Sequence, residues 1–107
     1  MTPQPPAPPD AADSLRRLRD GNRRFVAHGP GAESFEARLR RAEMVTGQSP
    51  FAIVLGCADS RVPAEIVFDQ GPGTLFVVRV AGNIVAPSQV GSVEFAAERF
   101  GTRLVVV

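Results

Sequence analysis

The segment FAIVLGCADSR, residues 51–61, decides the fold class of this chain. Its first five residues form an uninterrupted apolar run, which is typical of a strand that is covered on both faces of a sheet. A thiol, a carboxylate and a guanidinium follow at alternate positions, at Cys57, Asp59 and Arg61. The segment therefore predicts a buried strand that ends in a loop of chemically active side chains.

The sequence around this segment alternates between apolar runs and amphipathic stretches. The predicted strands are 51–55, 75–78 and 104–107, and the predicted helices are 14–28, about 34–43, 64–68 and 88–100. Strands that alternate with helices form a parallel sheet with right-handed crossovers. We therefore predict an α/β fold, in which flanking helices cover a parallel sheet.

Polar residues at the helix ends predict where the helices begin. Asp13 or Ser14 can cap the first helix, and Ser88 can cap the last one. On the first helix, Val26 is expected on the apolar face, which Asn22 interrupts with a polar side chain.

Composition limits the classes of function. The chain has 107 residues, of which 44% are hydrophobic, so it is one small domain or part of a larger one. A net charge of +1 and the absence of Trp and Tyr give no reason to expect a nucleic acid partner. Residues 1–13 are rich in proline and are expected to form a disordered lead-in to a domain at 14–107.

The single cysteine and the hydropathy of the chain bear on its location. One Cys excludes an internal disulfide and fits a reducing compartment. No apolar segment is long enough to cross a membrane, and the N-terminus lacks the features of a secretory signal. We therefore expect a cytoplasmic protein with no membrane partner.

Cys57, Asp59 and Arg61 together indicate a metal site. Taken singly, they read as a small buried residue, a helix cap and a solvated side chain. At this spacing, however, Arg61 can hold the Asp59 carboxylate ionised through a bidentate pair. A thiolate beside an oriented carboxylate is the start of a zinc site, and it lies at the strand end where such sheets bind ligands.

Several stretches of the sequence resemble the β-class carbonic anhydrases. They are QSPF at 48–51, CADSRVP at 57–63, FDQ at 68–70, FVVR at 76–79 and AGN at 81–83. The stretch RLRDGNRRF at 17–25 also resembles the N-terminal helix of that family. The resemblance covers residues 14–107.

The resemblance implies a zinc enzyme that interconverts carbon dioxide and bicarbonate. It makes Cys57 a zinc ligand, and zinc would lower the pKa of a bound water. Asp59 would orient the resulting hydroxide, or would leave Arg61 and take the fourth zinc position itself. Gln48 matches a residue that binds substrate, often across a subunit boundary, and Phe76 matches a wall of the carbon dioxide pocket, although core packing explains it equally well. A homo-oligomer, a dimer or larger, is also implied.

One part of the family pattern is absent from this sequence. The family places a His-x-x-Cys pair, which completes the zinc ligands, just beyond the strand predicted at 104–107. We therefore expect a fold truncated after the third strand, with an unpaired apolar edge, that binds zinc weakly and does not turn over. The alternatives are a non-catalytic remnant or dimerisation module of the same fold, and a cysteine-dependent hydrolase.

Overall fold

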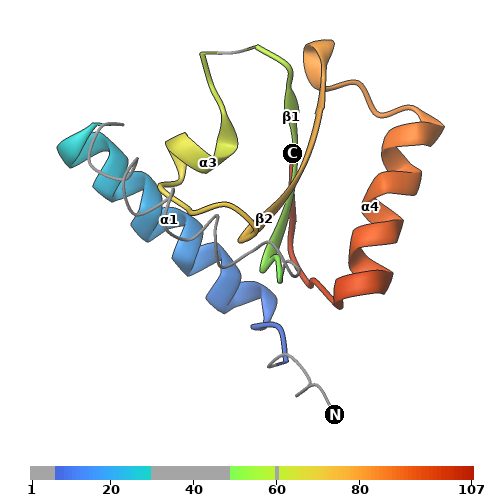
Figure 1. Cartoon of the computed structure of the whole chain (residues 1–107), viewed down its shortest axis with the longest axis horizontal. Coiled ribbons are helices and arrows are strands. Elements are labelled where there is room, and N and C mark those ends of the chain that lie inside the picture. Colours follow the sequence, from blue (N-terminus) through green and yellow to red (C-terminus); the bar gives the residue numbers. More distant parts are fainter. Residues whose placement is uncertain (1–6, 30–48, 60) are drawn as a thin grey trace.

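The computed structural model describes residues 7–29, 49–59 and 61–107. Its elements in chain order are α1 (Ala11–His28), β1 (Ala52–Cys57), α3 (Ala64–Val67), β2 (Leu75–Val80), the 3-10 turn η2 (Ala81–Asn83), α4 (Pro87–Phe100) and β3 (Val105–Val106) (Figure 1). The helix expected near 34–43 and the candidate Gln48 lie outside the described residues.

The three strands form one parallel sheet in the order β2-β1-β3, which confirms the predicted fold class. Strand β1 pairs with β2 from Ala52–Leu75 through to Cys57–Val80, and with β3 at Ile53–Val105. The chain therefore places β2 on one side of β1 and β3 on the other, so the strand order reverses at β1. In open α/β sheets this switch point, at the carboxyl ends of the strands, is where ligands bind.

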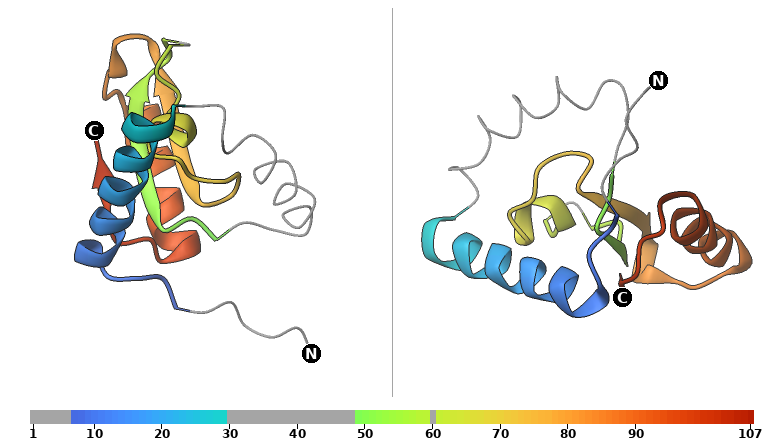
Figure 2. Two further views of the ribbon diagram at one scale, coloured as in Figure 1. Left: turned by 90° about the vertical axis from the view of Figure 1, so that its left-hand side faces the viewer. Right: turned by 90° about the horizontal axis from the view of Figure 1, so that it is seen from below.

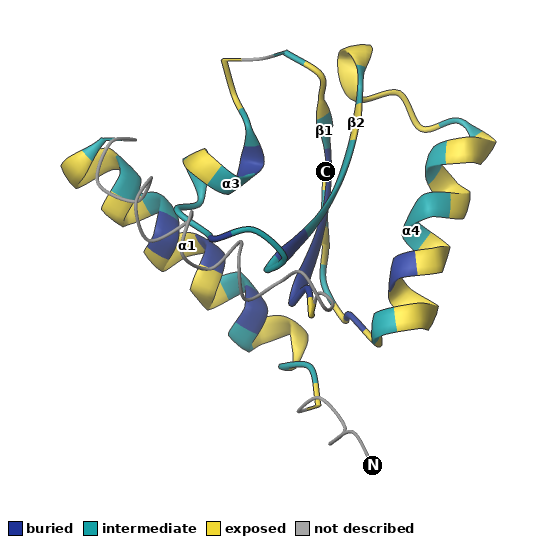
Figure 3. Ribbon diagram, in the orientation of Figure 1, coloured by how far each residue is buried: buried dark blue, intermediate teal, exposed yellow. Residues whose placement is uncertain are grey.

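Helices cover the sheet on both sides. Helix α4 lies on one side, and α1 and α3 lie on the other (Figures 1 and 2). The buried apolar cluster consists of Leu18, Phe51, Ala52, Val54, Ala64 and Leu75. Figure 3 shows this buried region along the amino-terminal part of the strands. Along β1, burial falls from Ala52, which is fully buried, to Cys57, which is exposed. The last residue of the strand is thus exposed to solvent.

Helix α1 begins earlier than predicted. It starts at Ala11 with Asp10 as its N-cap, whose Oδ1 accepts a hydrogen bond from the Asp13 backbone N–H at 2.7 Å. The prediction of Asp13 or Ser14 as the cap is therefore wrong, and the helix starts inside the segment predicted as a lead-in. Val26 is 76% exposed, so its expected place on the inner face is also wrong.

Helix α4 also begins one residue before its predicted cap. Ala86 is the N-cap, and its backbone N–H donates to Gln89 Oε1 at 3.1 Å. Ser88 lies inside the helix and donates its hydroxyl to the same oxygen, so the prediction that Ser88 caps the helix is wrong. Gly101 ends the helix in the left-handed conformation, with φ 68°, which glycine adopts without steric cost.

Polar contacts attach α1 to the last residue of α3 and to the segment that follows it. The Asn22 side chain donates to the Val67 carbonyl at 2.9 Å, and Gln70 Nε2 donates to the Arg17 carbonyl at 3.3 Å. Arg24 forms an ion pair with Asp69. Asn22, expected as an interruption of the apolar face, is thus a specific link between two elements.

The outer side of β3 pairs with no other strand in the described part of the chain. Val105 and Val107 on this segment are 44% and 73% exposed. None of the helices among the described residues is long and apolar enough to cross a bilayer.

Candidate functional site

The thiol of Cys57 lies at the switch point of the sheet and is exposed to solvent. Its Sγ accepts a hydrogen bond from the Gly82 backbone N–H at 3.4 Å, so η2 lies beside it. The backbone N–H groups of Asp59 and Gly82 lower the pKa of this thiol, because they stabilise the thiolate. They outweigh the opposing effects of desolvation and of the Asp59 charge.

Asp59 and Arg61 form the bidentate pair that their spacing predicts. Arg61 Nη2 lies 2.6 Å from Asp59 Oδ2, and Arg61 Nε lies 3.0 Å from Oδ1. The Arg61 backbone N–H also donates to Oδ1 at 2.9 Å. These hydrogen bonds lower the pKa of Asp59, and the bond from the Arg61 side chain has a larger effect than the bond from its backbone. The carboxylate is therefore ionised at neutral pH.

Arg79 of β2 contacts the same loop from the neighbouring strand. Its Nε donates to the Cys57 carbonyl at 3.1 Å, and its Nη2 donates to the Asp59 carbonyl. Arg79 lies in the stretch FVVR at 76–79 but is not among the predicted site residues. A basic residue at the end of the adjacent parallel strand is the signal that could have identified it.

Phe76 does not lie beside the Cys57 loop of its own chain. It pairs with Ile53, four register positions before the pair Cys57–Val80, which is about 13 Å at roughly 3.3 Å per residue. Its ring packs against Phe95 and Phe100, with centroids 6.0 Å away in each case. Within this chain Phe76 is therefore a packing residue between β2 and α4.

The donor atoms of the described residues do not complete a zinc site. A catalytic zinc usually has three protein ligands and one open position. No group of three or more His, Cys, Asp and Glu residues that could hold a metal occurs within 7–29, 49–59 and 61–107. The Cys57 thiolate is a suitable ligand, but the Asp59 carboxylate is bound to Arg61. The only His of the sequence, His28, is exposed at the end of α1.

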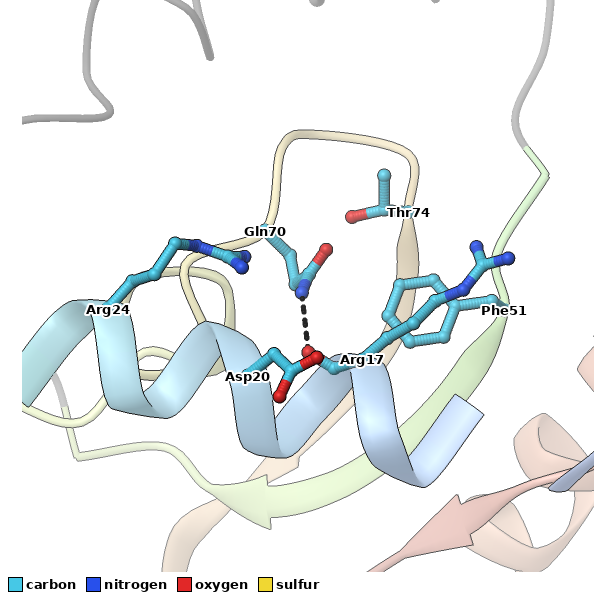
Figure 4. A pocket seen from close by; sticks show the side chains of 6 residues that line it. All are labelled: Arg17, Asp20, Arg24, Phe51, Gln70 and Thr74. Carbon is cyan, nitrogen blue, oxygen red and sulfur yellow. Dashed lines mark hydrogen bonds between the residues drawn. The ribbon is translucent and has the colours of Figure 1, made fainter. Parts of the chain in front are cut away.

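A separate cavity lies between α1 and the turn before β2 (Figure 4). It has a volume of about 340 Å³ and is lined by Arg17, Asp20, Arg24, Phe51, Gln70 and Thr74. The Arg17 guanidinium lies over the Phe51 ring, 5.4 Å from its centroid. None of the lining residues belongs to the loop at 57–61, so this cavity is not the candidate site.

Comparison with known proteins identifies a family whose match includes the Cys57 loop. Residues 52–107, more than half of the chain, match the family described as carbonic anhydrase. "Carbonic anhydrase 2" of Mycobacterium tuberculosis (strain CDC 1551 / Oshkosh) is 47% identical over 92 residues, which are 86% of this chain and 44% of that protein. The chain therefore spans less than half the length of this relative.

Solved structures agree with the fold. The β-carbonic anhydrase CcaA matches 85% of this chain and 45% of its own, with a TM-score of 0.58 and 25% identity. A structure described as one of two tetrameric β-carbonic anhydrases from Sordaria macrospora matches 87% of this chain and 47% of its own, with a TM-score of 0.58 and 23% identity.

Proposed function

The chain belongs to the β-class carbonic anhydrase family, and we propose that it supplies the N-terminal part of an active site for the reversible hydration of carbon dioxide to bicarbonate. One observation carries this proposal. At the switch point of a parallel sheet, an exposed thiol with a lowered pKa stands two residues before a carboxylate that an arginine holds ionised. Such a loop offers a soft metal ligand beside an oriented hydrogen-bond acceptor.

We assign a distinct role to each of the three side chains. Cys57 is the zinc ligand of this part of the protein. The zinc would supply the Lewis acidity that such hydration needs near neutral pH. Asp59, kept ionised by Arg61, accepts a hydrogen bond from the attacking group and so orients it. Arg61 competes with the metal for the Asp59 carboxylate, because its side chain binds both carboxylate oxygens and at least one of them must be released to ligate a metal.

By itself, this chain is proposed to bind zinc weakly and to be inactive. Its sequence holds one Cys and one His, and the described residues offer no set of three ligands. A complete zinc centre therefore requires donor atoms beyond those of the Cys57 loop. A cytoplasmic location is proposed as well, since a single free cysteine fits a reducing compartment.

Substrate contacts of Gln48 and Phe76 are proposed to be made in a homo-oligomer. Phe76 lies about 13 Å along the sheet from the level of Cys57, so it is too distant to line the pocket of its own chain. A second copy could bring Phe76 and Gln48 to this loop. The fold likeness to a protein described as tetrameric is in keeping with this assembly.

The first experiment measures zinc and activity in the isolated chain. We expect substoichiometric zinc after dialysis, abolished in Cys57→Ala, and no measurable hydration of carbon dioxide with zinc added. Activity close to that of an intact enzyme would refute the proposed inactivity. Zinc content that is unchanged in Cys57→Ala would refute the ligand role, and a chain that binds no zinc but forms a defined oligomer would favour the non-catalytic module.

The second experiment tests the loop in a complete site. A chimera joins residues 1–107 to the part of the M. tuberculosis relative that follows its matched region. We expect zinc-dependent hydration that is lost in Cys57→Ser and falls about 10- to 100-fold in Arg61→Gln, as for other residues that orient a metal ligand. Arg103→Gln, which removes the same charge far from the loop, is the control. A folded chimera whose activity survives Cys57→Ser contradicts the proposal.

A further inference from the structure

We propose that Arg79 is a positioning residue, which holds the loop at 57–59 in the conformation that presents the Cys57 and Asp59 side chains. This inference rests on the proposed function of that loop. Because Arg79 lies in β2, the site then includes a residue from outside the sequence pattern 57–61.

The contacts of Arg79 bridge two carbonyl groups that lie two residues apart. Its Nε donates to the Cys57 carbonyl at 3.1 Å, while its Nη2 donates to the Asp59 carbonyl. Between them, the Ala58 N–H donates to the Val80 carbonyl at 3.1 Å, which is the last backbone-to-backbone hydrogen bond from the described part of the loop to β2. Arg79 therefore supplies donors where the regular ladder between the strands ends.

A guanidinium is suited to this task because its donors form a planar, rigid fork. Fixing both carbonyls to one rigid group limits the rotation of the peptide units between Cys57 and Asp59. Those peptide units determine whether the Cys57 thiol faces the Gly82 N–H and whether the Asp59 carboxylate faces Arg61. A lysine at this position has the charge but not the fork, so it can replace only part of the contact.

Amide hydrogen exchange of the whole chain, followed by NMR, tests the inference. The reporter amides are those of Arg61, which donates to Asp59 Oδ1, and Gly82, which donates to Cys57 Sγ. In Arg79→Gln we expect their exchange to accelerate about tenfold, the scale of one lost charge-assisted hydrogen bond, and the Arg61 Nε–H resonance to shift. The amide of Ile53, bonded to the Leu104 carbonyl, should be unaffected.

Two further variants separate positioning from general stabilisation. Arg79→Lys should restore part of the protection, and Arg103→Gln, an exposed arginine at the opposite end of the strands, should leave both reporters unchanged. The inference is overturned by unchanged exchange in Arg79→Gln, by an equal effect in Arg103→Gln, or by acceleration that extends to Ile53.

The readout is independent of the metal. If the loop amides respond but zinc content does not depend on Cys57, the positioning role stands and the proposed function fails. If zinc content depends on Cys57 but the amides do not respond, the inference about Arg79 fails alone.

Discussion

The Asp59 carboxylate is bound on both of its oxygens by the side chain of Arg61, only two residues further along the chain. The shortest contact, Arg61 Nη2 to Asp59 Oδ2, is 2.6 Å. Because the Arg61 side chain is 84% exposed, the pair lies at the surface, where solvent and salt weaken ionic interactions. Its main consequence is therefore the orientation and the protonation state of Asp59, rather than the stability of the fold.

Arg61→Gln should raise the pKa of Asp59 toward that of an ordinary aspartate. The folded-state pKa is lowered, so the stabilisation is present above the unfolded pKa of about 3.9 and is lost as the pH falls through the folded value. The difference in unfolding free energy between wild type and variant should therefore vanish in acid. An NMR titration of the Asp59 carboxyl carbon checks the shift, with Arg61→Lys as an intermediate case. Identical titration curves in all three proteins would exclude the expected coupling.

Cys57 should react with iodoacetamide at lower pH than an ordinary cysteine. Its pKa is lowered by backbone N–H groups, of which that of Asp59 has the largest effect and that of Gly82 the next largest. The thiolate is therefore populated at pH values below the ordinary thiol pKa of about 8.5. The rate of alkylation against pH should have its midpoint below that of the same chain in denaturant, which serves as the control. A midpoint at or above that of the denatured chain would contradict the hydrogen-bonded geometry.

Gly21→Ala adds only one methyl group, but it should destabilise the protein strongly. A Cβ at this position of α1 would lie 1.7 Å from the Phe68 carbonyl oxygen, which is backbone and cannot move aside freely. The helix would have to shift, at a cost of about 1–3 kcal/mol, as in other overpacked sites.

Gly91→Ala is the matched control for this substitution. Gly91 also lies in a helix, α4, but its added Cβ would meet nothing within 4 Å. We expect a gain of about 0.5–1 kcal/mol from the better helix propensity of alanine. Chemical denaturation of both variants checks the contrast, and equal effects would refute the close approach of α1 to Phe68.

Two buried hydroxyl groups should respond oppositely to removal. Thr102 Oγ1 donates to the Pro50 carbonyl at 2.9 Å and joins the segments that lead into β3 and β1. Thr102→Val leaves that buried carbonyl without its donor, and we expect a loss of about 1–3 kcal/mol. The Ser14 hydroxyl has no hydrogen-bond partner among the described residues, so Ser14→Ala should be neutral or stabilising. Thermal unfolding measures both, and a large loss in Ser14→Ala would contradict the burial of an unpaired hydroxyl.

Local patterns predicted the strands and the reactive loop well. The apolar run at 51–55 became the central strand, since a residue covered on both faces has to be apolar in any register. The Asp59–Arg61 pair was also predictable, because two side chains that are two positions apart in a loop can reach each other. Helix starts were predicted less well, since several polar residues near each start can act as caps and Asp10 was preferred over Asp13.

Contacts between distant segments were beyond the reach of such patterns. Arg79 is 22 residues from Cys57, and it reaches the loop because β1 and β2 pair in one particular register. The same register separates Phe76 from Cys57, and the packing of α1 on Phe68 gives Asn22 its partner at Val67. Hydrophobic spacing and neighbouring charges are properties of a few consecutive residues and can be read along the chain. The alignment of one strand or helix against another depends on how the complete core packs, and therefore appears only in the folded molecule.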